Sequence, residues 1–473
     1  MLLKRFYDEP LAQASFLIAD TQAHEAIVVD PNRDVDAYLH AAKAEKLRIV
    51  AVTETHIHAD YLSGTRELAR RAGATAYLSD EGGPEWKYGW AHEPNVRRVK
   101  GGDTIRAGKV RLDVLPTPGH TPEHVSFVLT DEAASGEPLG VFTGDFVFAG
   151  DVGRPDLLER AANMKGTMEA GARTLFASLS RFRETLPGHL LLWPGHGPGS
   201  ACGKNLGGLP VTSLAYERLT NWGVKSANES EFVREVLAGQ PEPPAYFKHM
   251  KRMNRDGPPL LDGFREPPRL DDAELPAALE RGEPVVDLRP TRDVLAGAIP
   301  GVLAIPVGGS FPTWAGWFLP YDRPVTLLAN DAARARAAVR QLAMIGIDQV
   351  RGWYGPGAFA AWERARGPLA ITPSIDAKEA FERARKGELV LLDVRGSGER
   401  SDGHAVPGTR HIPLGDLPER AGELPRDRPV ALFCGGGTRS RIGVSVLRRA
   451  GFTQLLDQGG GFAAHAEAGL PVE

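Results

Sequence analysis

The chain has 473 residues, a formal net charge of −4, 42% hydrophobic residues and 25% charged residues. A chain of this length exceeds one hydrophobic core, so we expect two to four domains. The charge gives no electrostatic reason to expect a nucleic-acid partner. No apolar run approaches the roughly 18 residues that cross a bilayer, and the first ten residues lack a signal-peptide core, so we expect a cytoplasmic protein with no membrane partner.

The region from residue 1 to about 245 alternates short apolar runs with helical patterns. The apolar runs predict strands at 15–18, 26–29, 49–52, 110–115, 125–129, 140–143 and 190–193. The helical patterns lie at 63–72 and 167–180. This alternation predicts an α/β domain in which sheets pack between helical layers.

The sequence after this region divides into a linker and a repeat. Residues 246–270 are rich in proline and predict a linker that is packed down by its aromatic and methionine side chains. Val285-Val-Asp-Leu-Arg289 then matches Leu391-Leu-Asp-Val-Arg395, and similar matches follow along both copies. We therefore predict two tandem α/β domains at 271–367 and 372–473, with strands at 285–288, 325–328, 391–394 and 430–433.

Four loops in the first domain carry metal-binding side chains directly after apolar runs. His56 and His58 lie two residues apart in Thr-His-Ile-His-Ala-Asp-Tyr, a spacing that points both imidazoles to the same side of an extended segment. Gly-His120, Gly-Asp145 and Gly-His196 follow later strands, where α/β folds place functional groups. A lone histidine would merely hydrogen-bond in its loop, but the four loops together predict a metal site.

The order of these loops resembles the metallo-β-lactamase family over roughly residues 1–240. This resemblance implies an αββα sandwich, in which many members bind two zinc ions and carry a histidine where this chain has Tyr61. The closer resemblance is to the persulfide dioxygenases. It implies one Fe(II) per chain, held by His56, His120 and Asp145. It places the remaining polar side chains of the loops, His58, Asp60 and His196, around these ligands.

The same resemblance implies a substrate pocket. Gly153-Arg154-Pro-Asp156 is similar to the pocket segment of these dioxygenases, so Arg154 is expected to pair with a carboxylate of the thiol carrier, with Tyr61 nearby. The alternative for Arg154 is a salt bridge with Asp156. Cys202, one of only two cysteines, resembles a cysteine near the metal of related fusion proteins, where it is either a sulfur relay or a packing residue.

The second cysteine, Cys434, lies between an apolar strand and a helix. Glycines that turn their N–H groups inward, together with a helix N-terminus, stabilise a thiolate or a persulfide. The residues expected to cradle the sulfur are Gly435, Gly436, Gly437 and Thr438, and Arg439 closes the loop. The alternatives are a buried inert cysteine and a phosphatase loop.

This loop resembles the rhodanese sulfurtransferases, as do Asp393-Val-Arg395 and His404-Ala-Val-Pro-Gly408. The resemblance covers about residues 372–473 and implies that Arg439 binds a sulfonate or thiosulfate oxyanion. In the first copy, Ala329 stands at the position of Cys434 while Arg334 still matches Arg439. We therefore predict that residues 271–367 form an inactive rhodanese-like domain.

The full prediction is an αββα metallo-β-lactamase sandwich followed by two α/β rhodanese-like domains. Its predicted function is that of a bifunctional persulfide dioxygenase and sulfurtransferase, acting on a small-molecule persulfide, O₂, and sulfite or thiosulfate, and we expect a homo-oligomer. Two alternatives remain open: a zinc-dependent hydrolase such as a glyoxalase II-like thioesterase, and a non-catalytic sulfur carrier.

Overall fold

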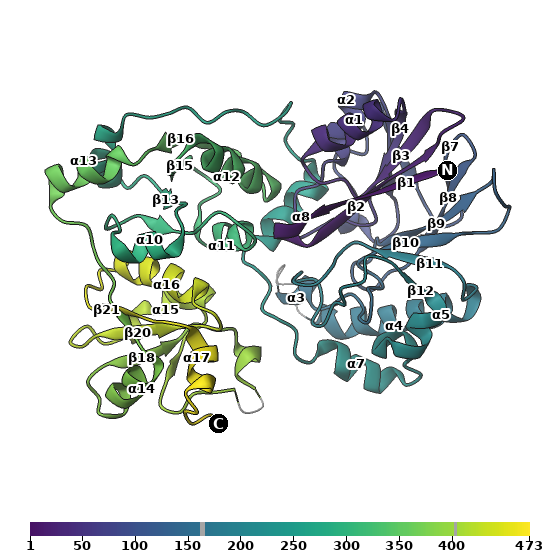
Figure 1. Ribbon diagram of the computed structural model, residues 1–473. Helices are drawn as coiled ribbons and strands as arrows, with labels where there is room; N and C mark the ends of the chain where they lie inside the picture. The colour runs from purple at the N-terminus through teal and green to yellow at the C-terminus, as the bar shows by residue number, and fades with distance from the viewer. Residues whose placement is uncertain (161–165, 402–403) are drawn as a thin grey trace. The chain divides into compact units, whose positions relative to one another are not determined.

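The computed structural model describes residues 1–160, 166–401 and 404–473. These residues form two compact units, 1–264 with 343–346, and 265–342 with 347–473, and Figure 1 shows both with their helices and strands. In the described part of the chain, no helix combines the length and the apolar character needed to cross a membrane.

The first unit contains two six-stranded sheets. The first sheet has, in spatial order, β1 (Leu2–Asp8), β2 (Gln13–Asp20), β3 (Glu25–Val29), β4 (Arg48–Thr53), β5 (Thr75–Ser79) and β6 (Val96–Val99). The second sheet has β12 (Thr212–Ser213), β11 (Leu191–Pro194), β10 (Gly140–Gly144), β9 (Val125–Asp131), β8 (Val110–Pro116) and β7 (Thr104–Ala107). The seven predicted strands of this region fall within β2, β3, β4, β8, β9, β10 and β11, except that residue 190 precedes β11, and β1, β5, β6, β7 and β12 were missed.

Helices cover the outer faces of both sheets. They are α1 (Val35–Ala44), α2 (Thr65–Ala72), α3 (Leu157–Arg160), α4 (Thr167–Thr185), α5 (Leu214–Thr220), α6 (Trp222–Lys225), α7 (Glu229–Leu237) and α8 (Phe247–Asp256). Phe16 of β2 packs against the second sheet, whereas its neighbour Leu17 packs with Leu68 of α2, as the alternation of a strand requires. Leu175 of α4 packs on the far side of the second sheet. The layers are therefore αββα, which confirms the predicted sandwich.

Helix α8 lies within the segment that was predicted to be a linker. Its buried residues are Phe247, Met250 and Asn254, one narrow stripe along a helix that is otherwise basic and exposed. Asn254 donates to the carbonyl oxygens of His58 and Tyr61, both at 2.8 Å, and accepts from the N–H of Ser63 at 2.9 Å. The helix therefore belongs to the first unit, because it supplies the hydrogen bonds that the loop after β4 needs.

The second unit contains two sheets whose neighbouring strands are all parallel. The first has β14 (Leu303–Ala304), β13 (Val285–Asp287), β15 (Val325–Leu328) and β16 (Val350–Tyr354). The second has β17 (Ser374–Ile375), β21 (Leu455–Gln458), β20 (Val430–Phe433), β18 (Val390–Asp393) and β19 (Arg410–His411). The helices are α9 (Leu275–Glu280), α10 (Thr291–Ala296), α11 (Phe311–Phe318), α12 (Ala332–Met344), α13 (Gly357–Arg366), α14 (Ala377–Arg385), α15 (Leu417–Arg420), α16 (Thr438–Arg449) and α17 (Gly461–Glu467).

The two copies of the repeat share a buried ion pair. Arg289 pairs with Asp287 at 2.7 Å and donates to the carbonyl oxygen of Gly297 at 2.8 Å. In the second copy, Arg395 pairs with Asp393 at 2.7 Å and donates to the carbonyl oxygen of His404 at 2.7 Å. The repeated Asp-X-Arg motif therefore has the same structural role in both copies, where it ties the end of a strand to the following loop.

We predict that Asn254→Ala destabilises the first unit by about 3 kcal/mol, since it leaves three buried backbone groups without a partner. Urea unfolding followed by tryptophan fluorescence measures the change. The control is Asn205→Ala, which truncates an exposed asparagine of the same unit. Equal unfolding midpoints for the two variants would contradict the role of α8.

Candidate functional site

Three buried side chains converge at the carboxyl ends of strands in the two sheets of the first unit. His56 follows β4, His120 follows β8, and Asp145 follows β10. Their ligand atoms all lie within 4.8 Å of one another. The Nε2 atoms of His56 and His120 lie 3.9 and 3.7 Å from Oδ2 of Asp145. The structure thus brings together the three side chains for which the sequence predicted metal binding.

The contacts of these side chains fit a bound cation. Nδ1–H of His120 donates to the carbonyl oxygen of Arg154 at 2.9 Å, which turns the lone pair of Nε2 toward Asp145. Burial and the neighbouring imidazoles lower the pKa of His56 well below its usual range, so this ring is also neutral. In the described residues, Nε2 of His56 and both carboxylate oxygens of Asp145 have no hydrogen-bond partner. Lone pairs of buried nitrogen and oxygen atoms that point at one another, with no hydrogen-bond donor between them, repel each other. A positive charge between these atoms would stabilise the arrangement.

A second cluster lies beside the first. Nε2 of His196 lies 3.1 Å from Asp60 and 3.4 Å from Asp145, while its Nδ1–H donates to the carbonyl oxygen of Ala12 at 3.0 Å. Burial opposes a charge on His196, but the carboxylates of Asp145 and Asp60 raise its pKa well above the usual value. The side chain of Cys202 completes this cluster. Asp60, His196 and Cys202 therefore also form a set of metal-binding atoms.

The position of Cys202 bears on its expected relay role. The thiol is buried, and burial, followed by the charges of Asp60 and Asp145, raises its pKa far above that of a free cysteine. A thiol under these conditions stays protonated, and sulfur exchange requires the thiolate. The surroundings of Cys202 therefore favour the packing interpretation over the relay.

His58 and Tyr61 contact a residue that sequence reasoning missed. Asp30, in the loop after β3, accepts from the N–H of Thr55 at 2.6 Å and lies 3.1 Å from Nε2 of His58. This contact raises the pKa of His58 despite burial, which acts in the opposite direction. The hydroxyl of Tyr61 donates to the carbonyl oxygen of Asp30 at 3.3 Å. Tyr61 is fully buried, so its contacts do not support the expected place in a substrate pocket.

Two further positioning residues, Glu123 and His124, were not assigned a role from the sequence. Glu123 accepts from the N–H of Ile57 at 2.8 Å and so holds the loop between His56 and His58. Burial raises the pKa of Glu123 to about 7. Nε2 of His124 accepts from the N–H of Asp145 at 3.2 Å. The spacing of these residues after His120 was the available signal.

Arg154 is fully buried and is bound by other groups of the chain. It pairs with Asp156 through two hydrogen bonds of 2.8 and 2.7 Å, and it donates to the carbonyl oxygen of Ala201 at 2.9 Å. The expectation that it pairs with a substrate carboxylate has no support from these contacts, whereas the alternative salt bridge is present. Through its own carbonyl oxygen, Arg154 also orients His120.

Cys434 lies at the end of β20, directly before helix α16. Its buried sulfur accepts from the N–H of Gly437 at 3.1 Å and lies 3.9 Å from the hydroxyl of Ser440. Gly437 has φ +100°, which turns this N–H toward the sulfur and begins the helix. Gly461 approaches from α17, where a Cβ atom would lie 2.3 Å from the carbonyl oxygen of Cys434, so this contact requires glycine.

The other residues that were expected to surround the Cys434 sulfur have only some of the predicted backbone conformations and contacts. Among Gly435, Gly436 and Gly437, only Gly437 has a positive φ. Thr438 is the first residue of α16. Arg439 closes the loop as predicted, but its guanidinium pairs with Glu399, with one hydrogen bond of 2.7 Å. The oxyanion site that was expected at Arg439 therefore already contains a carboxylate.

The equivalent loop of the first copy lacks the sulfur, because Ala329 stands at the position of Cys434. Ala329 is buried, and its N–H donates to the carbonyl oxygen of Tyr354 at 3.0 Å. Asp331 accepts from the N–H of Arg334 at 2.8 Å, and the guanidinium of Arg334 donates to the carbonyl oxygen of Leu288 at 3.1 Å. These contacts are those of a structural loop and agree with the predicted inactivity of residues 271–367.

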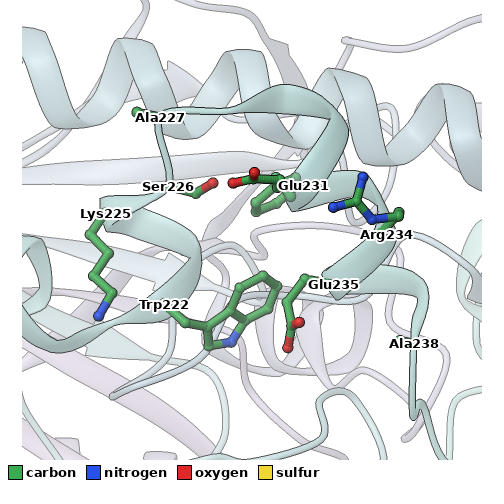
Figure 2. A pocket seen from close by; sticks show the side chains of 9 residues that line it. Trp222, Lys225, Ser226, Ala227, Glu231, Arg234, Glu235 and Ala238 are labelled. Carbon is green, nitrogen blue, oxygen red and sulfur yellow. The ribbon is translucent and has the colours of Figure 1, made fainter.

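A surface pocket lies apart from these clusters, between α6 and α7. Figure 2 shows that its lining combines the ring of Trp222 with side chains of both charges, among them Lys225, Glu231 and Arg234. None of the candidate metal ligands or loop residues lines it. The chemistry of the first unit therefore centres on the buried clusters rather than on this pocket.

In comparisons with known proteins, one family model matches the first part of the chain and another matches its last part. The family model of the metallo-beta-lactamase superfamily matches residues 8–196, and that of the rhodanese-like domain matches residues 376–468. The crystal structure of a metallo-beta-lactamase from Staphylococcus aureus subsp. aureus COL is 38% identical and superposes with a TM-score of 0.68. The match covers 75% of this chain and 99% of that chain.

Several curated relatives match the first unit, among them a persulfide dioxygenase and a hydroxyacylglutathione hydrolase. The mitochondrial persulfide dioxygenase ETHE1 of Mus musculus is 28% identical over 225 residues, which cover 47% of this chain and 75% of the relative. A hydroxyacylglutathione hydrolase of Gloeobacter violaceus is 33% identical over 184 residues, which cover 38% of this chain and 62% of the relative. From the fold, the converging ligand atoms and these matches, we conclude that the chain belongs to the metallo-beta-lactamase superfamily, with persulfide dioxygenase homologues, and that it carries a rhodanese-like domain at its C-terminal end.

Proposed function

We propose that this chain oxidises the outer sulfur of a small-molecule persulfide with O₂ and exchanges sulfane sulfur at Cys434. The observation that carries the proposal is the set of unpartnered atoms on His56 and Asp145, completed by His120, in a chain that also has a cysteine loop. Two imidazoles and one carboxylate are the ligands of non-haem Fe(II) oxygenases. The persulfide dioxygenase relative and the rhodanese-like match support the same assignment.

In the first unit, some of the buried residues would bind the metal and others would position these ligands. His56 and His120 would hold one Fe(II) per chain through Nε2, and Asp145 would hold it through its carboxylate. Bound Fe(II) supplies the redox chemistry by which O₂ reacts with sulfur. His196 and Asp60 lie beside Asp145 and orient its carboxylate. Burial of the whole cluster excludes water, which strengthens every charge interaction within it.

The proposed oxidation and sulfur transfer conserve atoms and charge. Oxidation converts R–S–SH, O₂ and H₂O into R–SH, SO₃²⁻ and two protons. At the second site, the Cys434 thiolate takes the outer sulfur of another persulfide and releases R–S⁻. The Cys434 persulfide then passes this sulfur to sulfite, which gives thiosulfate and restores the thiolate. The N–H of Gly437 stabilises the negative sulfur in both states.

The proposal has three further parts. Residues 271–367 form an inactive rhodanese-like domain, which the loss of the cysteine at Ala329 supports. The protein is cytoplasmic, which the presence of only two cysteines, both free and buried, supports. It assembles as a homo-oligomer.

One observation favours a second candidate function. Asp60, His196 and Cys202 could hold a second ion beside the first, and two adjacent zinc ions would activate a water for hydrolysis. The hydroxyacylglutathione hydrolase relative is consistent with this alternative. Tyr61 disfavours it, since many two-zinc members of the superfamily carry a histidine at this position.

Metal analysis separates the two functions. We expect elemental analysis of the protein reconstituted anaerobically to find one iron per chain, and an oxygen electrode to record O₂ uptake with a persulfide. Two zinc ions per chain together with no O₂ uptake would overturn the dioxygenase assignment in favour of the hydrolase.

We predict that Asp145→Ala abolishes O₂ uptake and lowers the affinity for Fe(II) more than about 100-fold, because it removes the anionic ligand. Competition with a chromogenic chelator measures the affinity. Asp256→Ala, which removes an exposed carboxylate of the same unit, is the matched control. Retention of iron by Asp145→Ala would show that this carboxylate is not a ligand.

We predict that Cys434→Ser leaves O₂ uptake intact but changes the product from thiosulfate to sulfite. The serine hydroxyl is of similar size but forms no persulfide, while the metal ligands lie in the other unit. Ion chromatography of the products after complete O₂ consumption makes the comparison. If the variant consumed no O₂, the proposed division of labour between the two sites would be wrong.

A further inference from the structure

The cation that closes the cysteine loop is paired within the chain. Glu399, in the short 3₁₀ helix η4 (Ser397–Arg400), binds both terminal nitrogens of Arg439. The same carboxylate accepts from the N–H of Gly396 at 2.9 Å. Because three donors hold it, two from a planar guanidinium, the Glu399 carboxylate is fixed at the mouth of the loop rather than free in solvent.

Arg439 also interacts with the reactive sulfur. The Glu399 carboxylate raises the pKa of Arg439, partial burial acts against this, and the Cys434 sulfur adds a further increase. The guanidinium nitrogen that binds Glu399 also lies 3.3 Å from the position of a Cβ on Gly435, the residue next to the cysteine. An oxyanion that reaches Cys434 must therefore share Arg439 with Glu399.

Two other arginines that flank the loop are paired as well. Arg395 binds Asp393 at 2.7 Å, and Arg441 binds Asp457 at 3.0 Å. Each guanidinium thus faces a carboxylate of the same domain, and Asp393 also lies 3.4 Å from Nε of Arg400. A dianion gains little from such neutralised cations and is repelled by the nearest carboxylate.

We propose that Glu399 determines the sulfur donor of Cys434: it weakens the binding of oxyanionic donors such as thiosulfate and leaves loading from a persulfide unaffected. This inference rests on the proposed sulfurtransferase function. In the reaction with thiosulfate, the Cys434 thiolate attacks the outer sulfur, the S–S bond of thiosulfate breaks, and sulfite leaves with the electron pair. Both the donor and the leaving group present oxygens to Arg439. A persulfide whose carbon chain ends in an ammonium group presents none.

The test replaces the carboxylate by the amide of the same shape. Glu399→Gln keeps one oxygen that can accept from both the N–H of Gly396 and Nη1 of Arg439, but it removes the charge. With cyanide as the acceptor, we expect KM for thiosulfate to fall about tenfold, the effect of one charge-assisted contact, whereas KM for cysteamine persulfide, whose ammonium group Glu399 does not repel, should not fall. Glu423→Gln, which alters a similar but exposed pair with Arg420, is the matched control and should change neither value.

A binding measurement gives a readout that does not depend on turnover. In a Cys434→Ser background, isothermal titration calorimetry should show that thiosulfate binds about tenfold more tightly when Glu399→Gln is added. The added variant Arg439→Gln should remove this gain, since the effect acts through that guanidinium.

The outcomes that overturn the inference are distinct from those that overturn the proposed function. Equal thiosulfate affinity with and without Glu399→Gln, or an equal change for both donors, would show that Glu399 does not select the donor. Absence of sulfur transfer from either donor in the unmodified chain would overturn the sulfurtransferase proposal. The calorimetric comparison would still decide the role of Glu399.

Discussion

The buried carboxylate of Asp145 is the constraint around which the first unit is arranged. Neither of its oxygens accepts a hydrogen bond in the described residues, and three imidazole nitrogens lie within 4 Å of it. An ionised carboxylate without compensation is among the most costly groups to bury. A bound cation relieves this cost, and the same cation supplies the chemistry. Stability and function therefore depend on the same few atoms.

The scaffold positions these atoms through hydrogen bonds that are themselves buried. Asp30, Glu123 and Asn254 bind the backbone of the loop after β4 from three different directions. The carbonyl oxygens of Arg154 and Ala12 fix the tautomers of His120 and His196. Residues that never approach the substrate thus decide where the ligand atoms point.

The two copies of the repeat in the second unit share a structural ion pair but differ at the loop that carries the cysteine. Both copies keep the Asp-X-Arg ion pair at the end of a central strand, where it ties the strand to the following loop. The copies differ at the loop, where one has Cys434 and the other has Ala329 with an aspartate that caps the helix. The first copy thus keeps the fold without the sulfur atom on which the proposed chemistry depends.

The sequence by itself determined the elements that depend on local patterns. Apolar runs located seven strands of the first unit, and the loops that follow them, together with the family resemblances, indicated the metal ligands and Cys434. Helix α8 was missed because the prolines around it indicated a linker, although its buried residues lie on one face of the helix.

Only the tertiary structure decided the partners of the polar side chains. Arg154 was expected to bind substrate but pairs with Asp156, and Arg439 was expected to bind an oxyanion but pairs with Glu399, which lies 40 residues away. Asp30 and Asn254 meet the metal loop across separations that no spacing rule covers. A sequence pattern specifies which face of an element a residue occupies, whereas the group it meets there depends on how distant segments close on one another.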